Sequence, residues 1–167
     1  DAEMYIEKYW GGSIGGTDYS LTLVEYLAEK NTAEISVREI FSDFGLNQMD
    51  GDFRNPETPC VFVIDGGWEM EIHYAIDLIS DLAALLLECR VNGTVDLAEL
   101  TDALESNRKI RITAEEEEDA LLNRTILDFV REPMEYDASE MMDEDEIREM
   151  TEACEHVLRD LYEGRLL

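Results

Sequence analysis

Apolar residues recur at helical spacing in two segments of the first third of the chain, and both segments predict helices. In the first segment, three apolar residues lie one helical turn apart on a single face: Leu21, Val24 and Leu27. Thr17 or Asp18 is expected to cap this helix, because both side chains can accept a hydrogen bond from a free backbone N–H. The second helix is predicted over residues 36–44, with Gly45 as its C-terminal cap.

A longer apolar stretch, residues 75–89, is hydrophobic on nearly every side. This pattern is typical of a central, buried helix rather than of a surface helix. Asn92 and Gly93 are expected to end it, and Asp96 then caps a short helix that runs to Leu104.

The C-terminal third of the chain predicts two amphipathic helices. Thr113 and Glu116 have the spacing of a capping box, so one helix is expected to begin there and to continue to about Arg131. The last helix is predicted to end at Tyr162, and two starting residues are open for it: Ser139 and Asp143.

Strand patterns are shorter and fewer. Residues 60–64, Cys-Val-Phe-Val-Ile, form the best strand in the chain, and Asp65-Gly66-Gly67 supplies a turn after it. Alternation of apolar and polar residues over 69–74 then predicts a return strand, with a helix directly after Gly67 as the alternative. Two further short strands are predicted at residues 4–10 and 110–112.

Together these patterns predict an α+β fold that is mostly α, a helical domain with a small antiparallel β-hairpin or sheet. The sequence contains no internal repeat and no linker-like segment rich in Pro, Gly or Ser. Its length favours one domain over residues 1–167, with the helical C-terminal third, residues 113–167, packed on the rest.

Charge adds a functional constraint to this picture. The chain carries 41 Asp and Glu against 13 Lys and Arg, a formal net charge of -28 at pH 7, although 45% of its residues are hydrophobic. The hydrophobic fraction excludes a disordered acidic tail. The excess is densest over residues 113–167, where 19 acids are set against 5 bases. A surface of this kind repels nucleic acid and anionic membranes and attracts cationic proteins.

Cysteine usage indicates a reducing compartment. Cys60, Cys89 and Cys154 are odd in number and far apart, so we expect inert thiols and neither a disulfide framework nor a zinc site. No basic segment precedes an apolar run at the N-terminus, and the apolar stretch 74–89 is too short to cross a bilayer. We therefore expect a cytoplasmic protein.

Two segments suggest cofactor or catalytic chemistry, and both have simpler explanations. The glycine-rich residues 11–16 are expected to break regular structure; they have P-loop glycine spacing, but Thr17 and Asp18 stand where Lys and then Ser or Thr are required. Three residues recur every four positions and would share one helix face: His73, Asp77 and Asp81. A small metal-dependent enzyme using these three is an open alternative, although a polar stripe on a buried helix is the simpler interpretation. No cofactor is predicted.

Two segments of the sequence carry a resemblance to a known family. Residues 9–23, Tyr-Trp-Gly-Gly-Ser-Ile-Gly-Gly-Thr-Asp-Tyr-Ser-Leu-Thr-Leu, resemble the N-terminal part of small bacterial immunity proteins encoded beside polymorphic or contact-dependent toxins. Residues 74–88, Tyr-Ala-Ile-Asp-Leu-Ile-Ser-Asp-Leu-Ala-Ala-Leu-Leu-Leu-Glu, are similar to their central helix. The resemblance implies a cytoplasmic, non-enzymatic inhibitor that binds a cognate toxin domain, often a nuclease.

Charge and resemblance together predict an immunity protein whose acidic surface binds a basic toxin domain, in particular a nuclease. A nuclease needs a cationic groove for phosphates, and an anionic inhibitor would compete for that groove. The binding surface is predicted from two acidic clusters and two aromatic anchors: Glu115, Glu116, Glu117, Glu118, Asp143, Glu144, Asp145, Glu146, Tyr136 and Trp68. The main alternative is a DNA mimic that inhibits a nucleic-acid-binding protein.

Overall fold

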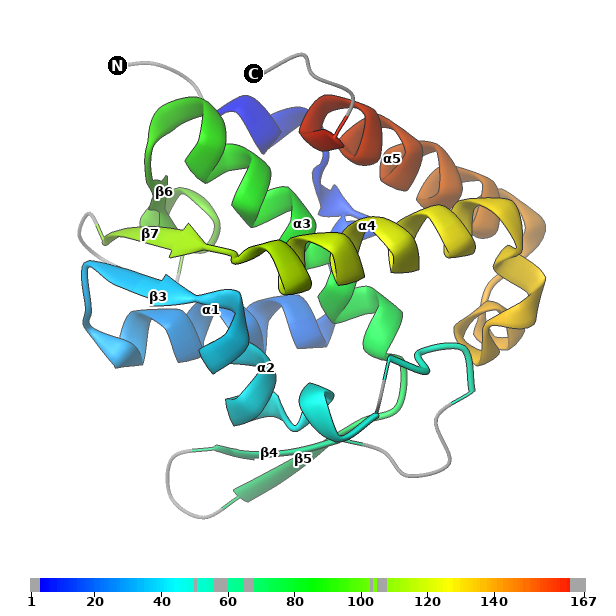
Figure 1. Ribbon diagram of the computed structural model, residues 1–167, viewed down its shortest axis with the longest axis horizontal. Helices are drawn as coiled ribbons and strands as arrows, with labels where there is room; N and C mark the ends of the chain where they lie inside the picture. Colours follow the sequence, from blue (N-terminus) through cyan, green and yellow to red (C-terminus); the bar gives the residue numbers. More distant parts are fainter. Residues whose placement is uncertain are drawn as a thin grey trace.

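The computed structural model describes residues 4–49, 51–55, 60–64, 68–102, 104 and 108–162 (Figure 1). Within these residues the α-helices are α1 (Asp18–Lys30), α2 (Val37–Phe44), α3 (Ala75–Asn92), α4 (Glu116–Arg131) and α5 (Glu144–Tyr162). Short 3-10 helices are η1 (Tyr5–Lys8), η2 (Leu46–Met49), η3 (Leu97–Glu99), η4 (Pro133–Glu135) and η5 (Asp137–Met141). The strands are β1 (Trp10–Gly12), β2 (Ile14–Gly15), β3 (Glu34–Ser36), β4 (Cys60–Ile64), β5 (Trp68–Ile72), β6 (Val95–Asp96) and β7 (Lys109–Thr113).

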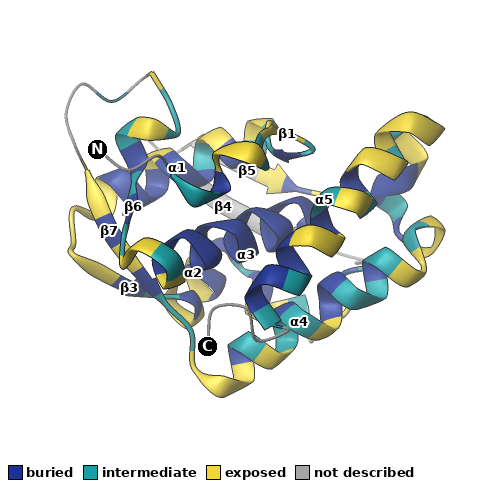
Figure 2. Ribbon diagram, turned by 90° about the horizontal axis from the view of Figure 1, so that it is seen from above, coloured by how far each residue is buried: buried dark blue, intermediate teal, exposed yellow. Residues whose placement is uncertain are grey.

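Helix α3 is the centre of the fold. Every residue from Ala75 to Cys89 is buried, as the sequence pattern predicts, and Figure 2 shows this dark blue helix enclosed by the others. Helices α1, α4 and α5 all pack against α3. One hydrophobic cluster runs from Ile6 to Leu161. The described elements from η1 to α5 therefore share one hydrophobic core.

The strands form small sheets around this helical core. β4 and β5 pair antiparallel over their whole length, so the predicted hairpin is confirmed and a helix directly after Gly67 is wrong. The turn at residues 65–67 lies outside the described residues. β7 lies between β3 and β6, parallel to β3 and antiparallel to β6. The α+β, mostly α fold class is therefore confirmed, with two parallel strand pairs, β1–β2 and β3–β7, that the sequence did not predict.

Helix caps follow the sequence closely at α1 and α2. Thr17 Oγ1 accepts a hydrogen bond from the N–H of Ser20 at 3.1 Å, and Ser20 Oγ accepts one from the N–H of Thr17 at 3.2 Å. Ser36 Oγ accepts from the N–H of Glu39 at 3.1 Å, and Gly45 ends α2 with a φ of 77°, which favours glycine. These interactions are local in sequence, which is why residue spacing predicts them.

The N-terminal segment differs from the prediction. Residues 5–8 form η1 instead of a strand, and the glycine-rich segment contains the short strands β1 and β2. The N–H of Ile6 donates a 3.0 Å hydrogen bond to the buried Glu88 side chain, and the N–H of Gly15 donates one of 2.8 Å to Asp81. Long-range bonds to carboxylates of α3 thus override local strand propensity here.

Two predicted helix boundaries, one start and one end, also differ. Thr113 does not cap α4, because it is the last residue of β7 and pairs with β3; α4 follows Glu115 without a side-chain cap. Asp96 does accept a hydrogen bond from a backbone N–H of η3, at 3.1 Å, but this helix ends at Glu99 instead of Leu104.

The described thiols are part of the core. Cys89 and Cys154 are buried and free, and burial raises the pKa of Cys89 to about 11 and that of Cys154 to about 12. Both therefore stay protonated at neutral pH. Among the described residues, no helix combines the length and the apolar character that crossing a bilayer requires.

Candidate partner-binding surface

The first predicted acidic cluster, at the start of α4, is partly neutralised within the chain. The guanidinium of Arg38 in α2 lies 3.2 Å from Glu115, 3.6 Å from Glu117 and 3.0 Å from Glu118. Glu118 is only 8% exposed, so it joins α2 to α4 rather than facing a partner. Glu116 is exposed.

The second predicted cluster, residues 143–146, begins α5, and all four of its residues are exposed. Asp143 accepts a hydrogen bond from the N–H of Glu146 at 2.8 Å, and Glu146 accepts one from the N–H of Asp143 at 3.4 Å. This reciprocal cap starts α5 after Asp143, the later of the two predicted positions. Asp145 pairs with Arg148 at 2.9 Å. Because such exposed pairs are weak, the cluster stays open to a partner.

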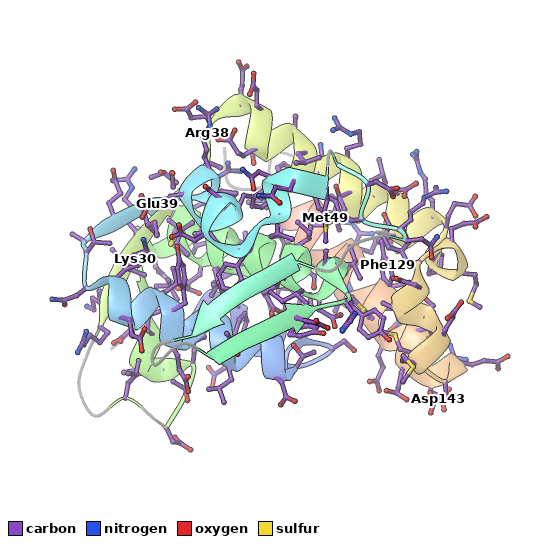
Figure 3. The ribbon with its side chains drawn as sticks, turned by 90° about the horizontal axis from the view of Figure 1, so that it is seen from below. Lys30, Arg38, Glu39, Met49, Phe129 and Asp143 are labelled. Atoms are coloured by element: carbon purple, nitrogen blue, oxygen red, sulfur yellow. The ribbon has the colours of Figure 1, made fainter. Side chains whose placement is uncertain are left out.

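The two clusters lie at opposite ends of the α4–α5 pair. Helices α4 and α5 run side by side in opposite directions (Figure 1), and α4, with 16 residues, is about 24 Å long. Figure 3 shows Arg38, beside the first cluster, far from Asp143 in the second. The structure therefore does not gather the eight acids into one patch, and they form two separate surfaces.

Tyr136 is not a surface anchor, and the prediction that it would be one is wrong. Its side chain is 2% exposed, and its hydroxyl donates a 2.7 Å hydrogen bond to Asp128 in α4. Its ring meets that of Phe129 edge-on, with centroids 5.1 Å apart. The ring is buried because α4 offers it both an apolar neighbour and a hydrogen-bond acceptor.

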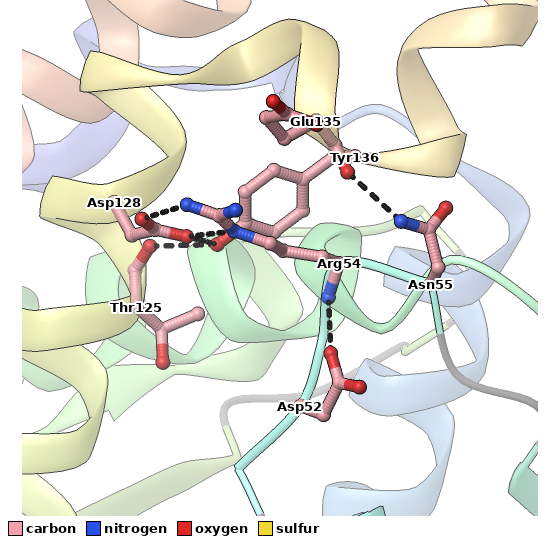
Figure 4. A network of polar contacts seen from close by, with 7 residues as sticks. All are labelled: Asp52, Arg54, Asn55, Thr125, Asp128, Glu135 and Tyr136. Carbon is pink, nitrogen blue, oxygen red and sulfur yellow. Dashed lines mark hydrogen bonds and ion pairs between the residues drawn. The ribbon is translucent and has the colours of Figure 1, made fainter.

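Arg54 completes a polar network around this tyrosine (Figure 4). Its guanidinium donates two hydrogen bonds to Asp128, at 2.8 and 2.6 Å. Hydrogen bonding to Arg54 lowers the pKa of Asp128, whereas burial, followed by the bond to Asp128, raises the pKa of Tyr136. The carboxylate is therefore ionised and the phenol is its donor over the neutral range.

This network holds the connector between α4 and α5, residues 132–143. The N–H of Asp137 donates to the backbone carbonyl of Arg54 at 2.9 Å. Within the connector, the Ser139 hydroxyl donates to the carbonyl of Pro133 at 2.6 Å. The connector backbone is thus fixed both to α4 and to the segment that carries Arg54.

Two exposed methionines lie on this connector, and sequence reasoning missed both. Met134 is 72% exposed and Met141 is 71% exposed, more than any other large hydrophobic residue that the structure describes. One sequence feature could have identified them. Both methionines lie among acids in a short segment without helical or strand periodicity, so the pattern there defines no face that would be buried in the core. Trp68, the second predicted anchor, belongs to β5, and its side chain lies outside the described part of the chain.

His73, Asp77 and Asp81 do not form a shared site. His73 is exposed, whereas Asp81 is fully buried and accepts hydrogen bonds from Gly15 N–H at 2.8 Å and from Ser20 Oγ at 2.6 Å. Burial raises the pKa of Asp77 to about 6 and that of Asp81 to about 7. No group of three or more potential metal ligands occurs in the described ranges. The structure therefore contradicts a metal-dependent enzyme built on these three residues.

A comparison with protein families gives the family of this chain. The family model of Immunity protein 68 matches residues 5–161, so the chain belongs to this family. The match covers α1 to α4 and nearly all of α5, and it confirms the resemblance seen in two short segments. Comparisons with curated proteins and with solved structures gave no significant match.

Replacing Tyr136 with Phe is expected to lower the free energy of unfolding by about 1 to 2 kcal/mol, because the hydrogen bond to an ionised carboxylate is lost while the ring stays in place. Urea denaturation measures this loss, and amide exchange across residues 133–139 should become faster. Tyr19→Phe is the control, since the Tyr19 hydroxyl accepts a hydrogen bond from the N–H of His73, outside the network. Unchanged stability and exchange in Tyr136→Phe would show that the network does not hold the connector.

Proposed function

We propose that this chain binds one cognate bacterial toxin domain through the acidic surface of its C-terminal third and thereby neutralises the toxin. Its membership in Immunity protein 68 supports an immunity function. The observation that favours an acidic binding surface is the imbalance of charge, since the described cations are largely occupied within the chain. Cations paired with carboxylates are Lys30, Arg38, Arg54, Arg90, Arg111, Arg148 and Arg159.

The same imbalance favours a nuclease as the toxin. A nuclease holds the phosphates of its substrate in a cationic groove, so its surface complements a chain with a net charge of -28. The inhibitor would be repelled by the nucleic acid itself and would compete with it for the groove. Inhibition of this kind needs no reacting group on the immunity protein, and it would take place in the cytoplasm, where the nucleic acid lies.

Electrostatic steering gives this proposal a kinetic signature. Raising the salt concentration from about 0.05 M to about 0.5 M shortens the screening length from roughly 14 Å to about 4 Å. The association rate with the toxin domain is therefore expected to fall at least roughly tenfold, while the dissociation rate changes little.

The test first looks for a toxin domain encoded beside the gene for this chain, and that domain is then purified with and without the immunity protein. Surface-based kinetics at several salt concentrations measure both rates, and a nucleic-acid degradation assay measures inhibition. A salt-insensitive association rate would contradict the acidic surface, and a toxin domain that leaves nucleic acid intact would contradict the nuclease. Capture of several unrelated DNA-binding proteins, without capture of the toxin, would favour a DNA mimic instead.

A further inference from the structure

The connector between α4 and α5 combines apolar and acidic side chains at the surface. Met134 and Met141 are both more than two-thirds exposed. Exposed acids flank each of them along the chain: Glu132, Glu135, Glu140 and Asp143. The four residues of the second acidic cluster continue directly from this connector into α5. The connector therefore presents two apolar side chains within a strongly negative corner of the molecule.

The fold does not need these methionine side chains. Packing of the connector is provided by other residues, because Tyr136 and Ala138 are each 2% exposed and Ser139 is 3% exposed. The backbone that carries the methionines is fixed by the network of Arg54 and Asp128. A surface with its backbone already ordered loses less conformational freedom when a partner binds. Methionine side chains adapt readily to the shape of an opposing surface.

We infer that Met134 and Met141 are the apolar anchors of the docking surface for the toxin domain. This inference rests on the proposed function. Charge complementarity selects the occupant, because the acids around both methionines attract a basic domain and repel an acidic one. A second copy of this chain is disfavoured, since two such corners would bring like charges together. The apolar contacts would slow dissociation, while the surrounding acids speed association.

The test replaces both methionines with glutamine, which has similar length and no charge. Met134→Gln/Met141→Gln is expected to raise the Kd for the toxin domain at least roughly tenfold, through faster dissociation and with unchanged association. Leu21→Gln is the matched control, because Leu21 is also an exposed large hydrophobic residue, 46% exposed, but lies on α1. Met134→Leu/Met141→Leu keeps an apolar surface and is expected to retain tight binding.

Each outcome of this comparison decides the inference. Faster dissociation in the glutamine variant alone supports it. A glutamine variant that dissociates as slowly as the wild type overturns the methionine anchors and leaves the proposed function intact. A leucine variant that binds the toxin domain as weakly as the glutamine variant has the same consequence. A wild-type chain that does not bind the toxin domain overturns the proposed function, and the docking surface with it. Thermal unfolding of all variants checks that the exposed substitutions leave the fold unchanged.

Discussion

The free energy of unfolding is expected to fall as the pH rises from about 5 to about 8, and Asp81 is expected to cause much of this fall. Its pKa is raised by burial from 3.8 to about 7, so between these values the folded state holds a proton that the unfolded state has released. Stability from this group is fully present below 3.8 and is lost as the pH rises through about 7. One such proton gives a slope of at most about 1.4 kcal/mol per pH unit.

Asp81→Asn isolates this effect. The amide oxygen can still accept from the N–H of Gly15, and the amide nitrogen can donate to Ser20 Oγ, so both contacts survive without a titrating group. The variant is expected to have a flatter stability profile and to exceed the wild type at pH 8. Asp18→Asn removes the same charge from an exposed position and serves as the control.

Urea denaturation at each pH measures the profiles. Measurements start at pH 5 because the isoelectric point, about 4.1, reduces solubility nearer to pH 4. Asp77, with a pKa raised by burial to about 6, contributes to the wild-type slope and remains in both variants. Parallel profiles for wild type and Asp81→Asn would show that Asp81 is already ionised in the folded protein.

The elements that the sequence predicted correctly are those whose determinants are local. The continuous apolar run from Ala75 to Cys89 predicts a buried α3, and Gly45 predicts the end of α2. The predictions are wrong where a residue far away in the sequence determines the local structure. The Glu88 side chain accepts a hydrogen bond from the N–H of Ile6 in η1, and no local sequence pattern predicts that contact. The parallel pairing of β3 with β7 likewise joins segments far apart in sequence.

The candidate surface was harder to predict than the fold because composition does not report exposure. By sequence Glu118 is one of four equivalent acids, but in the structure it is nearly buried and pairs with the exposed Arg38 of α2. Tyr136 reads as a surface aromatic between two acidic runs, and α4 buries it. Met134 and Met141 read as core residues by type, and the turn geometry of η4 and η5 leaves them exposed. In each case, residue type alone suggests an exposure opposite to the one in the structure.

Reversing the charge of Glu144 and Asp145, the first two residues of α5, is expected to slow association with the toxin domain by roughly tenfold to a hundredfold at low salt. The matched variant reverses Glu116 and Glu117, the first two residues of α4. Both double lysine variants change the net charge equally and place cations at a helix N-terminus, where the dipole disfavours them. Their stability costs should therefore be similar, which leaves position as the main difference.

The location of the reversed charges is expected to determine how much association slows. The α5 pair adjoins the connector that carries both methionines, whereas the α4 pair lies about one length of α4 away, roughly 24 Å, which is nearly two screening lengths at about 0.05 M salt. The α4 variant should thus slow association only about twofold to threefold, through the loss of overall charge. Association rates from stopped-flow mixing, measured across salt concentrations, test this difference. Equal slowing in the two variants would mean that total charge steers the toxin, and stronger slowing in the α4 variant would move the docking surface to the cluster around Arg38.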